Sequence, residues 1–453
     1  MTKQKTKQIL RALPAVLLVW LAVCLVLLPA LRPEPDWPVP SYPQSTGRVR
    51  VLEDNEEALL WRLRLIESAR ERLVLATFDF RDDSSGRDLM ASLYAAADRG
   101  VRVEMLIDGI GGVMHLSTSG AFRELAEHPN VTVRLYNPVN LLTPWRTNYR
   151  LHDKYLIADD WGYILGGRNT SDLFLGAPDA SANEDRDILV YEPEGEETTC
   201  SGLLAYFDSV WNLSCCKDFS GHGAPANLGD HYRAMTSRCP EAFEIPDWND
   251  ATLPTDGLTL LHGDPRPRIK APTLWRALVG SMERADQVTI ITPYLICGRE
   301  MYGDLTDLTS QGTQVRVLLN AVEKGANVFG CADYLNQQER LLECGLELCE
   351  YWGTHSMHTK TILIDDTVSI VGSCNADMRS VYLDTELMLV IESGEINRQL
   401  RQTVETMMER SRIRTPDGGL QVGTEFPEGD TPVWKQVLYG LLRVLTLPVR
   451  HLL

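Results

Sequence analysis

Two stretches of the chain carry the same sparse polar pattern: HDKYLIADDWGYILGGRN at residues 152–169 and HTKTILIDDTVSIVGSCN at residues 358–375. Both follow His-x-Lys-x4-Asp-x6-Gly-x-x-Asn, with identical spacing. At ordinary residue frequencies, the His-x-Lys-x4-Asp part alone arises by accident in roughly a few per cent of chains of this length. The complete pattern in both halves is not accidental. It predicts an internal repeat whose two copies build one composite site.

Each copy predicts a β-hairpin. The His and Lys stand two residues apart, so on a strand both side chains point to the same face. A turn follows at 159–160 or 365–366, where Asp side chains favour chain reversal. A second apolar strand then enters a loop at Gly166 or Gly372, where the backbone can approach a ligand closely.

These residue types suit attack on a phosphodiester. Ammonium groups and side-chain amides supply positive charge and hydrogen-bond donors around the phosphate oxygens. A neutral imidazole can attack phosphorus, while a second imidazole protonates the leaving alkoxide. The scheme needs no metal and no cofactor. The candidate residues are His152, Lys154, Asn169, His358, Lys360 and Asn375.

The two motifs resemble the signature of the phospholipase D superfamily. The resemblance spans roughly residues 50 to 410. Residues 73–108 and 287–320 resemble the strand–helix–strand unit that opens each half of the family fold. Residues 334–353 resemble the segment before the second motif in bacterial cardiolipin synthase-type members. The pattern Asn375-x-Asp377-x-Arg379-Ser380 and Glu386 match that subgroup closely.

The resemblance implies that His152 is the nucleophile and His358 the general acid, although the copies are symmetric enough for these roles to be exchanged. Acidic side chains would orient each ring and hold its tautomer. The candidates for this role are Asp187, after the first motif, and Glu386, after the second.

Four further positions belong to the candidate site. Asp159 and Asp365 stand at the hairpin turns, where fixing the loop by local hydrogen bonds is their favoured role. The residue after the motif glycine is a predicted substrate-binding position. It is Ser373 in the second copy but Gly167 in the first, where backbone donors would replace the family's hydroxyl.

The order of apolar strands and helical patterns predicts an α/β fold. The repeat predicts two similar α-β-α sandwich lobes, related by a pseudo-two-fold axis, with both hairpins at the seam. A chain of 453 residues can bury such cores. The predicted ranges are 49–235 for the first lobe, 236–262 for a connector, 263–415 for the second lobe and 416–453 for a tail.

The N-terminal residues predict a membrane anchor. A basic segment at 1–12 precedes an uncharged apolar run at 13–31, which is long enough to span a bilayer as a helix. A cleaved signal peptide is the alternative, but its apolar region is usually shorter and ends in a small-x-small site. The charge asymmetry orients the catalytic region to the extracytoplasmic side of a bacterial cell membrane, with a Pro-rich linker at 32–48.

Charge and cysteine content bear on the partners. The chain has 44 basic and 62 acidic residues, a formal net charge of −18, and lacks the basic run expected of a nucleic-acid enzyme. We therefore expect membrane phospholipids and the bilayer as partners, and no nucleic acid. The ten cysteines permit disulfides or buried free thiols, whereas a zinc site would lack its usual CxxC pair. The oligomeric state is not predicted by the sequence.

The tail ends in VWKQVLYGLLRVLTLPVRHLL, with apolar residues at helical spacing. Such a helix can lie in a membrane interface or dock on the protein's own core. With the anchor and the charge, the resemblance implies phosphatidyl transfer between membrane glycerophospholipids through a phosphohistidine, of the cardiolipin synthase kind. The alternatives are phospholipid hydrolysis to phosphatidic acid, and an extracytoplasmic phosphodiesterase or nuclease.

Overall fold

The structure is a computed structural model, and it describes residues 41–177, 182–193, 195, 197–427 and 431–453. The predicted basic segment 1–12, the predicted anchor 13–31 and most of the linker therefore lie outside the described residues. Within the described ranges, no helix has both the length and the apolar character needed to cross a bilayer.

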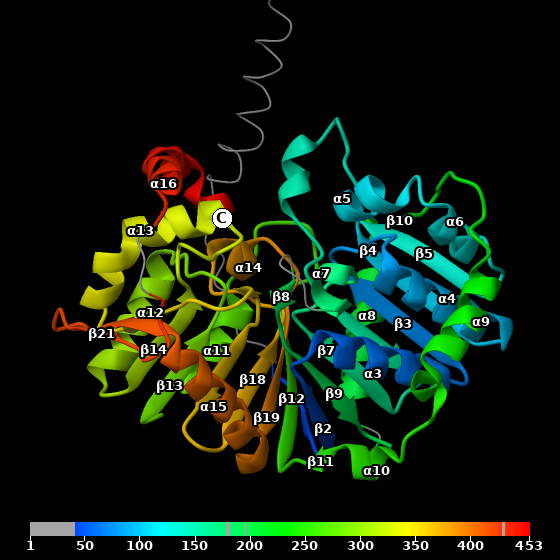
Figure 1. Ribbon diagram of the computed structural model, residues 1–453, viewed down its shortest axis with the longest axis horizontal. Coiled ribbons are helices and arrows are strands. Elements are labelled where there is room, and N and C mark those ends of the chain that lie inside the picture. Colours follow the sequence, from blue (N-terminus) through cyan, green and yellow to red (C-terminus); the bar gives the residue numbers. More distant parts are fainter. Residues whose placement is uncertain (1–40, 178–181, 194, 196, 428–430) are drawn as a thin grey trace, which may run out of the picture.

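Two mixed β-sheets form the framework (Figure 1). The first has nine strands, in the spatial order β10 (Lys217–Asp218), β5 (Val131–Tyr136), β4 (Arg102–Asp108), β3 (Arg72–Thr77), β6 (Tyr155–Ala158), β7 (Gly162–Gly166), β9 (Asp187–Tyr191), β2 (Arg48–Leu52) and β11 (Leu253–Pro254). The second has ten, in the order β1 (Gln44–Ser45), β12 (Gly257–His262), β19 (Leu387–Glu392), β18 (Val368–Gly372), β17 (Thr361–Ile364), β13 (Gln287–Ile291), β14 (Gln314–Asn320), β15 (Glu347–Tyr351), β20 (Ser411–Arg414) and β21 (Leu420–Val422).

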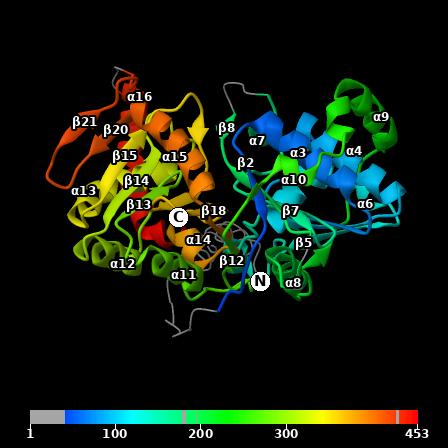
Figure 2. The ribbon, with the colours of Figure 1, turned by 90° about the horizontal axis from the view of Figure 1, so that it is seen from below.

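Helices cover both faces of each sheet, as the predicted sandwich requires. In Figure 2, α3 (Asn55–Ser68) and α4 (Ser84–Asp98) lie on one side of the first sheet and α8 (Thr199–Trp211) on the other. Around the second sheet, α15 (Gly394–Glu409) lies opposite α11 (Thr273–Met282) and α12 (Arg299–Ser310). In this view, a half turn about the line of sight brings the helices of the first lobe to the positions of their counterparts in the second. The two-lobed α/β repeat is therefore present.

The remaining helices are shorter or peripheral. In the first lobe they are α5 (Gly109–Gly111), η2 (Gly112–Leu116), α6 (Gly120–Ala126), η3 (Pro144–Asn148), α7 (Asp172–Leu175), α9 (Leu228–Arg238), η4 (Pro240–Phe243) and α10 (Trp248–Ala251). In the second lobe and the tail they are α13 (Val328–Glu343), α14 (Met378–Tyr382), α16 (Val433–Thr446) and η5 (Leu447–Leu452).

The structure moves the predicted lobe boundaries. Residues 236–262 do not form a connector, because β11 is an edge strand of the first sheet and β12 lies inside the second. The end of the predicted linker, β1, pairs with β12 of the second lobe, whereas β11, which precedes β12 in the chain, pairs with β2 of the first. Each half thus donates its leading strand to the other, an exchange that hydrophobic patterning alone does not reveal.

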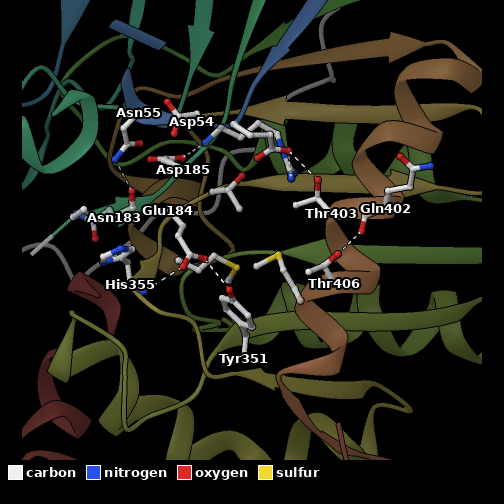
Figure 3. A pocket seen from close by; sticks show the side chains of 16 residues that line it. Asp54, Asn55, Asn183, Glu184, Asp185, Tyr351, His355, Gln402, Thr403 and Thr406 are labelled. Carbon is white, nitrogen blue, oxygen red and sulfur yellow. Dashed lines mark hydrogen bonds and ion pairs between the residues drawn. The ribbon is translucent and has the colours of Figure 1, made fainter. Parts of the chain in front are cut away.

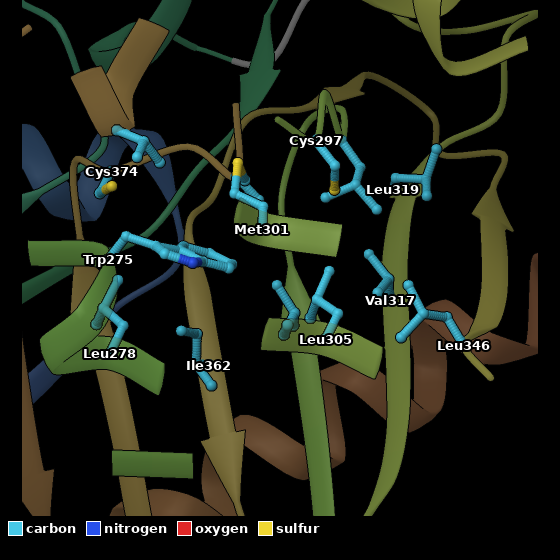
Figure 4. Packing of buried hydrophobic residues seen from close by; sticks show 14 of the residues in the cluster. Trp275, Leu278, Cys297, Met301, Leu305, Val317, Leu319, Leu346, Ile362 and Cys374 are labelled. Atoms are coloured by element: carbon cyan, nitrogen blue, oxygen red, sulfur yellow. The ribbon is translucent and has the colours of Figure 1, made fainter. Parts of the chain in front are cut away.

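Buried side chains form three hydrophobic clusters. One lies under the outer helices of each lobe, and Figure 4 shows the second-lobe cluster around Trp275, Met301 and Ile362. The third contains the sheet faces that α8 and α15 cover, and it joins residues of both lobes, such as Val74 and Leu363. Because this cluster crosses the seam, the two lobes share part of their core.

The predicted hairpins are confirmed, as β6 pairs antiparallel with β7 and β17 with β18. Their turns contain Asp159 at φ 52° and Asp365 at φ 43°, in the left-handed region that Asp tolerates better than most residues. The carboxylate of Asp159 accepts hydrogen bonds from the backbone N–H groups of residues 70, 71 and 72 at 3.0, 2.8 and 2.8 Å. Asp365 accepts from residues 286 and 287 at 3.0 and 2.9 Å.

Replacing Asp159 by Ala should destabilise the fold. The change removes the acceptor for three backbone donors and places Ala in the left-handed region, so we expect a loss of about 2–3 kcal/mol in the free energy of unfolding. Chemical denaturation of the detergent-solubilised chain measures this loss. The neighbouring Asp160 is exposed and serves as the matched control. Equal stability of the Asp159→Ala and Asp160→Ala variants would contradict the assignment.

Candidate active site

Both motif histidines lie at the seam, immediately before their hairpins. In the first lobe, Leu151 forms a parallel bridge with Thr385 of the second. In the second lobe, Met357 pairs in parallel with Glu184 of the first, where β16 (Ser356–Met357) meets β8 (Asn183–Glu184). These two pairings occupy equivalent positions in the repeat. Each histidine therefore follows a residue whose backbone pairs with the opposite lobe.

The imidazole of each histidine binds a carboxylate of the opposite lobe. His152 Nδ1 lies 2.8 Å from Glu386 Oε1, and His358 Nδ1 lies 2.6 Å from Asp185 Oδ2. A carboxylate accepts the Nδ1–H, which fixes the tautomer and leaves Nε2 with its lone pair. Both rings are therefore held in the state needed for attack or proton transfer.

Aromatic edges fix the planes of the two rings. The ring of Phe78 packs against His152 with centroids 5.2 Å apart, and that of Phe174 packs against His358 at 5.0 Å. Both contacts have the edge-to-face geometry that aromatic pairs prefer. Each imidazole is thus constrained by one carboxylate and one aromatic side chain.

The two lysines are buried beside the histidines. Lys154 Nζ donates to the backbone carbonyl of His152, and Lys360 Nζ to that of His358. Burial lowers the pKa of Lys154 to about 7 and that of Lys360 to about 8, because the ammonium form loses its hydration. The ammonium forms of both lysines are therefore destabilised in the ligand-free protein, and a bound anion would stabilise them.

The motifs share one electrostatic environment. Burial and the charge of Lys154 lower the pKa of His152 well below its ordinary value, and the second motif adds to this through Lys360 and His358. Burial and Lys360 lower the pKa of His358 to about 4, with a further contribution from Lys154. Both imidazoles are accordingly neutral near pH 7 in the ligand-free protein.

The motif asparagines retain hydrogen-bonding capacity. Asn169 and Asn375 are buried, and within the described part of the chain neither side-chain oxygen has a hydrogen-bond partner. The Asn375 amide donates to the hydroxyl of Tyr294 at 3.4 Å. Because unsatisfied buried polar groups are costly, this matched pair is what a site built for a polar ligand would contain.

The predicted role of Asp187 is wrong. Its carboxylate is fully buried and accepts hydrogen bonds from Arg62 at 2.8 Å and Arg168 at 3.3 Å, both in its own lobe. The residue that orients His358 is Asp185, which the sequence reasoning missed.

The repeat itself carried the signal for Asp185. Gly166 of the first motif pairs with Asp187, and Gly372 of the second pairs with Met388. Counting back two residues from each partner gives Asp185 and Glu386. Aligning the apolar runs 188–190 and 389–391 would have given the same answer.

The predicted substrate-binding positions support these carboxylates instead. The Ser373 hydroxyl donates to Glu386 Oε2 at 2.5 Å and accepts from the backbone N–H of Leu387 at 3.1 Å. At Gly167, a Cβ atom would lie 2.2 Å from Asp185 Oδ1. The change from Ser to Gly between the copies thus follows the change from Glu to Asp, because the shorter carboxylate lies against the loop backbone.

Asp159 and Asp365 do not belong to the reacting centre. Each stands at the far end of its strand from the motif histidine, and the four residues of that strand alone span roughly 13 Å. Their carboxylates bind the backbone that opens β3 and β13, which is the structural role favoured for them. The remaining motif residues surround the crossed histidine–carboxylate pairs.

A cavity of about 520 Å³ lies on one side of the site and shares Asp185 with it (Figure 3). Thr359 and Met407 are among its other lining residues. The equivalent place in the first lobe is filled, because Tyr206 on α8 donates to the fully buried Asp153 at 3.0 Å. The pseudo-two-fold symmetry of the motif residues therefore does not extend to the side chains behind them, where Tyr206 of the first lobe has Met407 as its counterpart.

The comparisons with known proteins agree with this geometry. Residues 63–211 and 279–408 match the family described as cardiolipin synthase, PLD-like domain. The chain belongs to the phospholipase D superfamily. Within it, cardiolipin synthase C of Escherichia coli (strain K12) is 31% identical over 394 residues, covering 76% of this chain and 80% of that protein. Cardiolipin synthase B of the same strain is 26% identical over 367 residues, covering 79% of each.

The fold is also that of a solved enzyme. The crystal structure of phosphatidylserine synthase from Haemophilus influenzae Rd KW20 superposes with a TM-score of 0.63 at 16% identity, covering 89% of this chain and 95% of that one. The family and its relatives support a phospholipase D-type phosphatidyltransferase. No cysteine within the described residues forms a disulfide, so the nine described thiols are free.

Exchanging the residues that support the carboxylates should have unequal effects on turnover. Gly167→Ser forces Asp185 away from His358. A displacement of about 1 Å in a positioning group lowers kcat roughly a hundredfold. Ser373→Gly removes one hydrogen bond to Glu386, which corresponds to roughly a tenfold loss. Steady-state kinetics on a soluble short-chain phosphodiester measures both, with thermal unfolding as a check on folding. A folded Gly167→Ser variant with wild-type kcat would refute the role of Asp185.

Proposed function

We propose that the protein transfers a phosphatidyl group from one membrane glycerophospholipid to an alcohol acceptor, as a cardiolipin synthase-like enzyme working through a phosphohistidine. The observation that carries this proposal is the pair of crossed imidazole–carboxylate contacts with two buried lysines beside them. Two oriented bases and two cations around one space suit a phosphodiester that must be attacked and released in turn.

In the first step, Nε2 of His152 attacks phosphorus and forms a P–N bond. The P–O bond to the departing alcohol breaks, and that alkoxide takes a proton from Nε2 of the His358 imidazolium. In the second step, the acceptor hydroxyl gives its proton to Nε2 of His358 as its oxygen attacks phosphorus and the P–N bond breaks. Lys154 and Lys360 balance the charge that collects on the non-bridging oxygens.

The two carboxylates support this division of roles. Burial would raise the pKa of Asp185, but His358 and Lys360 hold it below its usual range, so this carboxylate stays charged and favours an imidazolium at His358. Burial raises the pKa of Glu386 to about 7, so its charge is weaker and leaves His152 neutral. The first step requires a neutral nucleophile and a cationic acid. The pKa of His358 is about 4 in the ligand-free protein, so its imidazolium forms when a bound phosphodiester anion adds negative charge and raises that pKa.

The relatives of the chain and its charge both favour a lipid substrate. The named relatives are cardiolipin synthases, and a chain with a net charge of −18 lacks the overall basic character of nucleic-acid enzymes. We further propose that residues 13–31 anchor the chain in the cell membrane with the catalytic region outside. Within the described residues no group of His, Cys, Asp and Glu could hold a metal ion, and no step of the proposal uses one.

Product analysis by mass spectrometry tests the reaction. The full chain, reconstituted with phosphatidylglycerol, should release glycerol and form cardiolipin, whereas phosphatidic acid alone would indicate hydrolysis. His152→Ala and His358→Ala should each lower turnover by about a thousandfold or more, as loss of a nucleophile or general acid does. The exposed His222 provides the matched control. Turnover retained in either motif variant would contradict a single composite site.

A substrate with a good leaving group separates the two roles. A p-nitrophenyl phosphodiester needs no general acid, so His358→Ala should regain the first step and accumulate phosphate on His152. His152→Ala should remain inactive on the same substrate. The reverse pattern would assign the nucleophile to His358.

The lysine pKa values predict a rise of KM with pH. As pH increases through about 7 for Lys154 and about 8 for Lys360, these groups lose their charge in the free protein. A bound phosphodiester raises both values, so KM should increase while kcat changes less. Kinetics on soluble short-chain phosphatidylglycerol from about pH 6 to about pH 10 measures this. A flat KM accompanied by a falling kcat would contradict it.

A further inference from the structure

Exposed apolar side chains gather on two segments that are far apart in the sequence. Before η3, Leu141 and Leu142 are 80% and 83% exposed, and Val139 is also exposed. On α16, Trp434, Val437, Leu441, Val444 and Leu445 are all exposed. Isolated exposed leucines are ordinary on soluble proteins, but a set of this size marks an interaction surface.

One stripe of α16 already has a partner. Tyr439 and Leu442 are buried against the second-lobe core, and the Tyr439 hydroxyl donates to the carbonyl of Val322 at 2.5 Å. The helix therefore docks on the protein, as one of the two sequence interpretations expected. The exposed apolar residues of α16 form a second face that nothing in the described chain covers, whereas amphipathic surface helices normally have one apolar stripe.

Arg379 holds the two apolar segments together. Its guanidinium donates to the carbonyl of Leu452, at the end of η5, at 3.1 Å and to the carbonyl of Asn148, at the end of η3, at 2.6 Å. Asn148 precedes His152 by four residues, and Arg379 follows Asn375 by four. Arg379 thus joins the ends of η3 and η5 beside the segments that carry the motif residues, and Figure 1 places α16 and α5 at the same, upper end of the molecule.

The segments that carry these apolar residues also lack acidic residues. None of the 62 acidic residues of the chain falls within 109–123, 137–150 or 431–453, which contain α5, η2, η3, α16 and η5. Arg450 is paired with Asp333 at 2.9 Å, while Arg443 on α16 is exposed. In a chain of net charge −18, apolar segments without acidic residues of their own complement an anionic lipid surface.

We propose that the loop at 139–142 and the outer face of α16 form one docking surface, which inserts into an anionic bilayer. The inference rests on the proposed function, because a lipid head group must leave the bilayer to reach the histidines. A second copy of the chain fits less well, since two copies would bring like charges such as Arg443 face to face. The Trp434 side chain suits the boundary between acyl chains and head groups.

Site-specific quenching tests the surface without requiring turnover. The full chain carries Leu142→Cys or Leu441→Cys in a Cys239→Ser background, because the other described cysteines are buried. Each variant is labelled with a fluorophore and added to vesicles of equal phosphatidylglycerol and phosphatidylcholine that contain an acyl-chain nitroxide. Matched controls are Ile245→Cys and Leu420→Cys, at positions that are 61% and 55% exposed but lie outside the surface.

Labels at 142 and 441 should be quenched at least about threefold more than labels at 245 and 420, because an interfacial face buries several ångströms into the acyl boundary. Equal quenching at all four positions would overturn the proposal. Quenching between labels of two copies, without quenching by the lipid, would overturn it in favour of self-association. Because the readout needs no reaction, loss of the proposed activity leaves this result unaffected.

Charge substitutions give an independent readout. Leu142→Glu and Leu441→Glu should lower activity on vesicles by about tenfold or more, yet leave activity on dispersed short-chain lipid within about twofold. Ile245→Glu should leave both activities unchanged. Equal losses on the two substrate forms would show that the residues serve the fold or the reaction rather than docking.

Discussion

The crossed contacts between each motif histidine and a carboxylate of the opposite lobe are the constraint on which the rest depends. His152 is held by Glu386 and His358 by Asp185, so neither lobe can orient its own imidazole. Buried charges are tolerated only when they are paired. The two lobes must therefore be held in a fixed position relative to each other. The reciprocal exchange of β1 and β11 and the hydrophobic cluster shared by both lobes provide that rigidity.

The repeat keeps the reacting groups symmetric but varies what surrounds them. Asp185 with Gly167 replaces Glu386 with Ser373, and the shorter carboxylate keeps its charge more firmly. One layer away, Tyr206 fills the first lobe where the second has a cavity lined by Met407. These differences are a physical basis for giving two nearly equivalent histidines different tasks in one reaction.

The sequence predicted what periodicity and spacing encode. Alternation predicted both hairpins, and the repeated motif predicted two lobes and six side chains of the candidate site. Residues 236–262 were misassigned because strand exchange between lobes depends on tertiary pairing. The prediction of Asp187 is wrong because Asp185 and Asp187 lie beside the same strand, and only the positions of Arg62 and Arg168 show that Asp187 is neutralised within its own lobe. The shared role of Arg379 likewise needs coordinates.

Nitrogen-15 NMR of the histidine rings tests the crossed arrangement most directly, because the shifts report which ring nitrogen carries the proton. In the full chain labelled at histidine, Glu386→Gln should perturb the ring signals of His152, in the opposite lobe, and leave those of His358 in place. Asp185→Asn should do the converse. If either substitution perturbs only the histidine of its own lobe, the crossed pairing is contradicted and the single composite site with it.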